Sequence, residues 1–169
     1  MKYFLLIFFS IITTCTFCQK KKSIGIDVVH ISSLTKNQAK KSLFNTAIAL
    51  QATYRKNIIG TNYLCIAFAN TLNSTNSLQL QKLTVGYESE MQFLGLNKFF
   101  IKSDFSVYRF YNKSNSYNSM SVGLSLEFGA NIKLFNKCFL RPSHSVNLLL
   151  PGNITSFLDN ISLGTFIEL

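Results

Sequence analysis

Apolar and polar residues alternate one by one over Met120–Asn131, the stretch MSVGLSLEFGAN. Every second residue from Met120 to Ala130 is apolar, and every residue between them is small or polar. Because successive side chains of a β-strand point to opposite faces, this period of two predicts a strand with two unlike faces. A soluble sheet would turn the apolar face inward. A membrane barrel would turn it toward lipid and the polar face toward its lumen.

Seven further segments alternate in the same way, and none shows the sustained spacing of an amphipathic helix. The eight predicted strands are Ser23–Ile31, Ser42–Arg55, Thr61–Asn70, Lys82–Leu94, Lys98–Tyr111, Met120–Asn131, Cys138–Leu149 and Ser156–Leu169. The seventh is the weakest, because His144 and Pro142 interrupt it and proline lacks an amide donor for the ladder. The sequence therefore predicts an all-β fold.

The connections between these strands alternate between long and short. The first, third and fifth connections are longer and rich in Asn, Ser and Lys, and the second and fourth are shorter, whereas the sixth and the seventh, LPGNIT, have six residues each. Outer-membrane barrels show this alternation, with long loops outside the cell and tight turns in the periplasm. It also predicts an even number of strands with both chain ends on the short-turn side. We therefore expect a closed antiparallel up-and-down barrel of eight strands in the cell outer membrane.

The first 18 residues, MKYFLLIFFSIITTCTFC, have the order of a secretory signal peptide: one Lys, an apolar run, then small residues. The run is shorter than the roughly 20 residues of a spanning helix. We expect a cleaved signal peptide over 1–18 and a barrel domain over 19–169; a retained anchor, or a lipoprotein at Cys15 or Cys18, is the alternative. Cleavage leaves Cys65 and Cys138, either as an export-dependent disulfide or as two small, partly buried residues.

The composition is strongly hydrophobic and basic. The chain of 169 residues is 47% hydrophobic and only 14% charged, with a formal net charge of +10. A basic balance suggests nucleic acid, an anionic membrane surface or an anionic glycolipid as partner. Most lysines are scattered over predicted turns, without a basic helix or an aromatic platform, so nucleic acid is not expected. We expect contact with outer-membrane lipid and lipopolysaccharide, and a monomer.

The rows of charge help to orient the predicted barrel. In the second strand the apolar row from Phe44 to Tyr54 rises about 25 Å, the height of an outward apolar band. The opposite rows carry a polar cluster that we place in the lumen, balanced further by Lys82 and by Arg55 or Arg109. Its members are Arg55, Glu88, Glu90, Lys102, Asp104 and Glu127. Eight strands enclose a bore just wide enough for side chains, so a plugged lumen is expected. The alternative is a secreted soluble barrel that turns its Phe and Leu rows inward around an apolar ligand.

Few residues are arranged for chemistry. Glu88 and Glu90 lie two apart on one face, a spacing at which paired carboxylates can do acid–base work. His30, with Ser32 and Ser33, lies near the outer end of the first strand, but the sequence places no second partner there. The only other histidine is His144, and no ligand-type spacing of His and Cys is present. We therefore expect no catalysis, no metal and no cofactor.

The whole pattern after residue 18 resembles the small outer-membrane β-barrel family of Bacteroidetes-type bacteria. The most local resemblance is the C-terminus, Ser162–Leu169 or SLGTFIEL. It is similar to the C-terminal signal that the barrel assembly machinery reads, with Gly164 after a polar residue and hydrophobic Ile167 and Leu169. The family usually has aromatic residues at the last two of these positions. The resemblance implies an envelope or surface role and assembly by that machinery.

Overall fold

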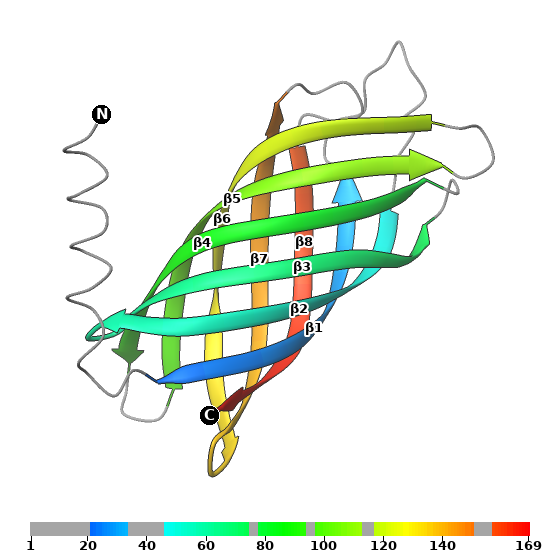
Figure 1. Cartoon of the computed structure of the whole chain (residues 1–169). Helices are drawn as coiled ribbons and strands as arrows, with labels where there is room; N and C mark the ends of the chain where they lie inside the picture. Colours follow the sequence, from blue (N-terminus) through cyan, green and yellow to red (C-terminus); the bar gives the residue numbers. More distant parts are fainter. Residues whose placement is uncertain (1–20, 34–45, 75–77, 94–96, 113–116, 151–156) are drawn as a thin grey trace, which may run out of the picture.

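The computed structural model describes residues 21–33, 46–74, 78–93, 97–112, 117–150 and 157–169. Eight antiparallel strands form a closed barrel in which each strand pairs with its neighbours in chain order and β1 pairs with β8 (Figure 1). The strands are β1 (Lys22–Ser33), β2 (Thr46–Ile59), β3 (Asn62–Ser74), β4 (Gln79–Phe93), β5 (Asn97–Asn112), β6 (Tyr117–Phe135), β7 (Cys138–Leu150) and β8 (Phe157–Glu168). The predicted fold class is confirmed. The proposed signal peptide and Phe44 lie outside the described residues.

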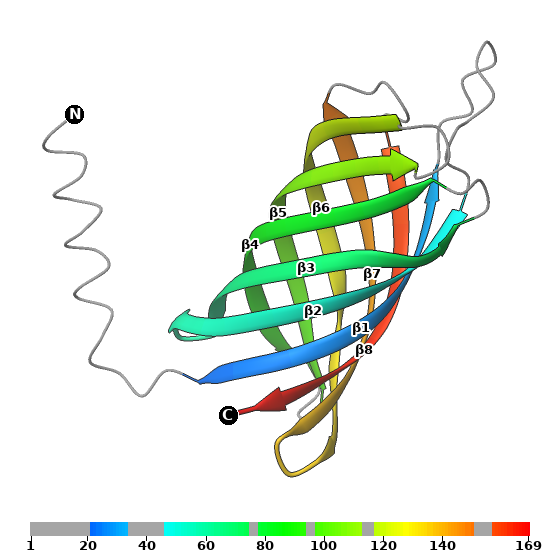
Figure 2. The same cartoon turned by 45° about the vertical axis from the view of Figure 1, so that its right-hand side comes forward.

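The barrel has two unlike ends. We call the end with the β2–β3 and β6–β7 connections the short-turn end, and the opposite end the long-loop end. Figure 2 shows the strongly tilted strands wrapping between these ends, with β1 and β8 side by side and the C-terminus at the short-turn end. The β2–β3 turn contains Gly60 with φ of 59°, and the β6–β7 turn contains Asn136 with φ of 34°. Glycine and asparagine are the residues that tolerate this left-handed backbone.

Most strands are longer than predicted. β6 extends three residues before Met120 and four beyond Asn131, and β2 continues through Lys56 to Ile59. The alternation of apolar and polar residues weakens at these ends, because strand segments outside the apolar band do not face hydrocarbon. The backbone ladder continues there all the same. The sequence pattern therefore marks the height of the band and not the full length of the strands.

The outward rows carry the large apolar side chains. Leu124 and Leu126 are each 56% exposed, and Phe105 is 51% exposed. Such residues lie on the outside of all eight strands. Soluble monomers rarely expose contiguous apolar patches larger than about a few hundred Å². The barrel therefore faces hydrocarbon, and the alternative of a soluble barrel with inward Phe and Leu rows is wrong. None of the described residues forms a helix long and apolar enough to span a bilayer.

Candidate functional site

Buried side chains of two kinds fill the lumen at different heights. Toward the short-turn end lies a network of charges, which we call the ionic half. The buried charged residues of the lumen are Asp27, Arg55, Lys82, Glu88, Glu90, Lys102, Asp104, Glu127 and Arg141. Toward the long-loop end lies a cluster of apolar side chains, which we call the apolar plug. The two halves are built from different stretches of the same inward rows.

Glu88 is the centre of the ionic half. It is fully buried and lies between two guanidinium groups from other strands. Arg141 Nη2 donates to Glu88 Oε2 at 2.5 Å and its Nη1 to Oε1 at 3.2 Å, while Arg55 Nη1 donates to Oε1 at 2.7 Å. The Arg141 guanidinium also stacks on the Phe100 ring, 3.5 Å from its centroid. This paired, two-pronged geometry is the strong form of a charge-assisted hydrogen bond. It joins β2, β4 and β7 across the lumen.

Glu90 continues the network toward the short-turn end. Its Oε1 accepts hydrogen bonds from Arg55 Nη1 at 2.6 Å and from Asn131 Nδ2 at 2.7 Å. Its Oε2 lies 3.2 Å from Lys98 Nζ, whose side chain is 37% exposed. The pair with Lys98 therefore reaches the mouth of the barrel, whereas the pair with Arg55 is enclosed. Both Glu88 and Glu90 are fully engaged as counter-ions, which leaves neither free for acid–base work.

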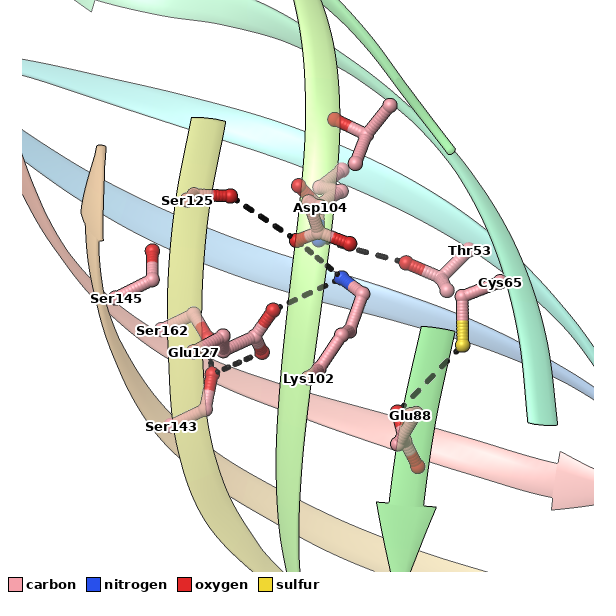
Figure 3. A network of polar contacts seen from close by, with 12 residues as sticks. Thr53, Cys65, Glu88, Lys102, Asp104, Ser125, Glu127, Ser143, Ser145 and Ser162 are labelled. Carbon is pink, nitrogen blue, oxygen red and sulfur yellow. Dashed lines mark hydrogen bonds and ion pairs between the residues drawn. The ribbon is translucent and has the colours of Figure 1, made fainter. Parts of the chain in front are cut away.

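Lys102 forms a second charge cluster nearer the middle of the lumen. Its Nζ lies 2.9 Å from Glu127 Oε2 and 3.0 Å from Asp104 Oδ2, so one ammonium bridges two carboxylates (Figure 3). Ser125 donates to Asp104, and Ser143 donates to Glu127 (Figure 3). A buried charge is stable only when it is paired and hydrogen-bonded. The small serines of β6 and β7 supply those extra hydrogen bonds.

Glycines on the inward rows make room for these side chains. A Cβ atom built on Gly86 would overlap the Asp104 carboxylate of the neighbouring strand, and one on Gly164 would overlap the Asp27 carboxylate. A Cβ on Gly25 would lie 2.5 Å from the Phe166 ring. These glycines are therefore seats for a side chain from the next strand. The close approach explains why the inward rows contain glycine beside the Asp104 and Asp27 carboxylates of the paired strands.

The apolar plug fills the other half of the lumen. Leu80, Phe110 and Leu158 are fully buried at the long-loop ends of β4, β5 and β8. The complete cluster consists of Val29, Ile31, Ala47, Ala49, Leu78, Leu80, Tyr108, Phe110, Leu149 and Leu158. Tyr108 lies at the edge of the plug that faces the ionic half. The Tyr108 hydroxyl donates to Asn147 Oδ1, which also accepts a hydrogen bond from Lys82 Nζ. The polar cluster expected for the lumen is thus only half of the filling.

Little space remains where the two halves meet. The void lined there by Lys82, Lys102, Glu127 and Asn160 has a volume of about 10 Å³. A cavity needs roughly 10–15 Å³ to hold one water molecule. At this level the described side chains, apolar on one side and ionic on the other, therefore leave room in the lumen for about one water molecule.

The structure brings all six residues of the predicted polar cluster into the lumen and adds Arg141 to them. Arg55, Glu88 and Glu90 meet in one group, and Lys102, Asp104 and Glu127 meet in another. The prediction of Arg109 as a possible counter-ion is wrong, because Arg109 faces outward and donates to Asn118 near the long-loop end. Arg141 takes that role and was missed, because Pro142 and His144 obscure the alternation of β7. The one signal for Arg141 is its place between Leu140 and Pro142, which puts it on the row opposite the outward residues of β7.

Among the described residues, the remaining candidates do not converge on one site, although Ser32 contacts Asp159, whose carboxylate pairs with His144. His30 faces outward on β1, and the hydroxyl of Ser32 donates to the backbone oxygen of Asp159. Cys65 is buried in the lumen and Cys138 is partly buried on β7, and both are free thiols. Within the described residues no three His, Cys, Asp or Glu side chains are placed to hold a metal ion. Gly164 faces inward, whereas Ile167 and Leu169 are exposed on the outside.

No protein-family model matches the sequence, and no curated protein is similar to it. Solved structures match its fold. Neisserial surface protein A (NspA) has a TM-score of 0.66 at 10% identity, covering 89% of this chain and 97% of NspA. The N-terminal barrel domain of Pseudomonas aeruginosa OprF has a TM-score of 0.66 at 8% identity, covering 89% of this chain and 100% of that domain. Ail, the attachment invasion locus protein of Yersinia pestis, has a TM-score of 0.55 at 11% identity, covering 89% and 97%.

These likenesses show a fold, and the surface of the barrel agrees with it. An apolar exterior on every strand and a charged interior are the arrangement that an outer-membrane barrel requires. The protein has the fold of the small eight-stranded outer-membrane β-barrels and lies in the outer membrane.

Proposed function

We propose that the protein is a non-conducting, non-enzymatic outer-membrane barrel with a structural or surface-interaction role. The observation that carries this proposal is that apolar and ionic side chains fill the middle of the lumen. A solute would have to separate Leu80, Phe110 and Leu158 and then break the ion pairs of Glu88 and Lys102. Glu88, Glu90 and Glu127 are each paired with a buried Arg or Lys, which supports a role without catalysis.

Conductance measurements test the closed lumen. The purified protein is reconstituted into planar lipid bilayers, with a general porin treated in the same way as the control. We expect no stepwise current from folded protein, with folding verified by the heat-dependent gel shift of an intact barrel. Reproducible single-channel steps from folded protein would contradict the proposal.

For the surface role, we propose lipopolysaccharide as the partner of the long-loop end. The net charge of +10 supports attraction to sugar phosphates. Three of the lysines, Lys36, Lys40 and Lys41, fall in the first long connection. Ail, one of the structures with this fold, has been crystallised with the heparin analogue sucrose octasulfate, itself a polyanionic sugar. Binding of lipopolysaccharide to the barrel in nanodiscs should weaken steeply with salt, and alanine at these three lysines should weaken it further. Unchanged binding in that variant would contradict the assignment.

For biogenesis, we propose that the barrel assembly machinery recognises the strand ending in Gly164, Ile167 and Leu169, and that the barrel stays a monomer. We also propose a Bacteroidetes-type origin, which the resemblance of the sequence pattern supports. Replacing Ile167 and Leu169 by Ser should slow insertion into membranes that contain the machinery while leaving spontaneous folding into detergent unchanged. Equal slowing in both systems would show a general folding defect and contradict recognition.

A further inference from the structure

One ionisable pair lies on the lipid-facing wall, away from the lumen. His144 occupies the middle of the outward row of β7, with Cys138, Leu140 and Pro142 on one side and Val146, Leu148 and Leu150 on the other. The imidazole Nε2–H donates to Asp159 Oδ1 of β8 at 2.6 Å. Ionisable groups facing hydrocarbon are costly and usually mark a functional site.

The pair is not fully enclosed by the protein. The side chains of His144 and Asp159 are 33% and 22% exposed. The Phe128 ring covers one side of the imidazole, with the centroids 5.0 Å apart. A carboxylate offers about four acceptor positions, and among the described residues the imidazole N–H occupies one of those of Asp159. Asp159 therefore has capacity for a further hydrogen-bond donor from the membrane side.

An apolar groove of about 530 Å³ begins beside this pair. Phe128 and Ile161, the cross-strand partners of His144 on β6 and β8, both line it. From there it runs toward the short-turn end past Phe99 and Met91. Its volume falls within the range of about 300–1,000 Å³ that is usual for small-molecule pockets.

The groove follows from the local sequence. Ala130 and Pro142 are the small outward residues at its floor, between the large side chains of the neighbouring strands. The β6–β7 ladder pairs Gly129 with Ser143 and resumes only at Ile132 with Leu140. Pro142 has no N–H to give to the ladder, so the strands lose two paired positions there. The groove therefore follows from the residues of β6 and β7 at this place.

We propose that this groove binds a single hydrocarbon chain of a membrane amphiphile whose hydroxyl or amide N–H donates to Asp159. The two parts of the site match the two parts of such a molecule: an apolar channel in the hydrocarbon-facing band and an acceptor at one end. The site faces lipid, so chains of the bilayer reach it without a separate entry path. This inference rests on the outer-membrane placement and is independent of the surface role and of lipopolysaccharide.

The absence of tryptophan from the chain gives a clean reporter. Phe99→Trp places one fluorophore in the groove, and Phe68→Trp places one on the outward row of β3. The two parent side chains are similarly exposed, 46% and 49%. Both variants are reconstituted into phosphatidylcholine nanodiscs with a long-chain alcohol brominated at mid-chain, or with its methyl ether, which has no donor. Comparing alcohol with ether at each reporter cancels any difference in bilayer depth.

The proposal predicts that Phe99→Trp is half-quenched at a mole fraction of alcohol roughly two- to tenfold below that of ether, the preference of one net hydrogen bond. Phe68→Trp should show no preference. Asp159→Leu should abolish the preference, and Ala130→Phe should do so by filling the groove while leaving the ion pair intact. The heat-dependent gel shift verifies folding of each variant. Equal half-quenching by alcohol and ether at Phe99→Trp would overturn the proposal. So would weaker quenching at Phe99→Trp than at Phe68→Trp by both probes, which would show that a second copy covers the groove.

Discussion

The two halves of the lumen close the same bore by different physics. In the apolar plug, Leu80, Phe110 and Leu158 fill space without needing specific partners, and their contacts are non-directional. In the ionic half, Glu88 requires Arg55 and Arg141 at defined positions, with distances of 2.5–3.2 Å. A plug of leucines tolerates small shifts between strands, whereas a guanidinium fork on a carboxylate does not.

The difference assigns each half a separate task. The ion pairs connect residues 33 and 53 positions apart in the chain, and each is broken by a register slip of a strand. Buried ion pairs add little net stability compared with apolar residues, but removing one partner is expensive. We infer that the ionic half specifies which inward residues meet, while the apolar plug supplies stabilisation that depends only on volume.

Breaking the centre of the ionic half should have the largest effect. Glu88→Leu leaves the Arg141 guanidinium buried without its carboxylate, which should cost about 3–5 kcal/mol. Denaturant unfolding in lipid vesicles measures the change. The double variant Glu88→Leu with Arg141→Leu should recover much of the loss, because the uncompensated charge is then gone. A double variant no more stable than Glu88→Leu would contradict the account.

Breaking the apolar plug should cost slightly less and be insensitive to charge. Leu80 is fully buried, so Leu80→Ala should leave a cavity and destabilise the barrel by about 2–5 kcal/mol. Because the ionic half still blocks the bore, the variant should remain silent in planar bilayers. Stepwise conductance of folded Leu80→Ala would show that the plug alone seals the lumen.

The sequence contains most of the fold. All eight strands, and the outward rows of every strand except β7, could be predicted, because lipid on one side and a narrow lumen on the other impose a strict period of two. The ends of the strands could not, since outside the apolar band neither row needs one kind of residue. Phe110 illustrates this: it lies between Arg109 and Tyr111, where the two rows no longer differ in polarity.

The candidate site was predictable only in part. The charges of β4 and β5 alternate cleanly and were placed in the lumen from the sequence. The apolar plug could not be predicted. Leu78 and Leu80 share the inward row with Lys82, and the change from apolar to charged residues along this row favours a loop before Lys82. The partner choice of Glu88 depends on which strands face each other across the bore. That geometry appears only when the barrel closes.

Removing the space for a lumen charge should have a smaller effect than removing the charge. Gly86→Ala places a methyl group against the Asp104 carboxylate, so one of them must move. Such overpacking should cost about 1–3 kcal/mol, measured by the same unfolding experiment. In the Asp104→Ala background the same change should cost much less. Additive effects of the two substitutions would show that Gly86 is not a seat for Asp104.

The smallest effect is expected at the edge of the ionic half. Lys98 is 37% exposed, and Glu90 keeps Arg55 and Asn131 as partners without it. Lys98→Ala should therefore cost less than about 1 kcal/mol, as exposed ion pairs do. In 1 M salt, where screening acts over about 3 Å, this cost should vanish, while that of Glu88→Leu should persist because its charges are enclosed. A loss of stability in Lys98→Ala that equals the loss in Glu88→Leu and does not change with salt would mean that the ionic half is one cooperative network up to the mouth of the barrel. The graded division of the lumen into a directional interior and a solvated edge would then be wrong.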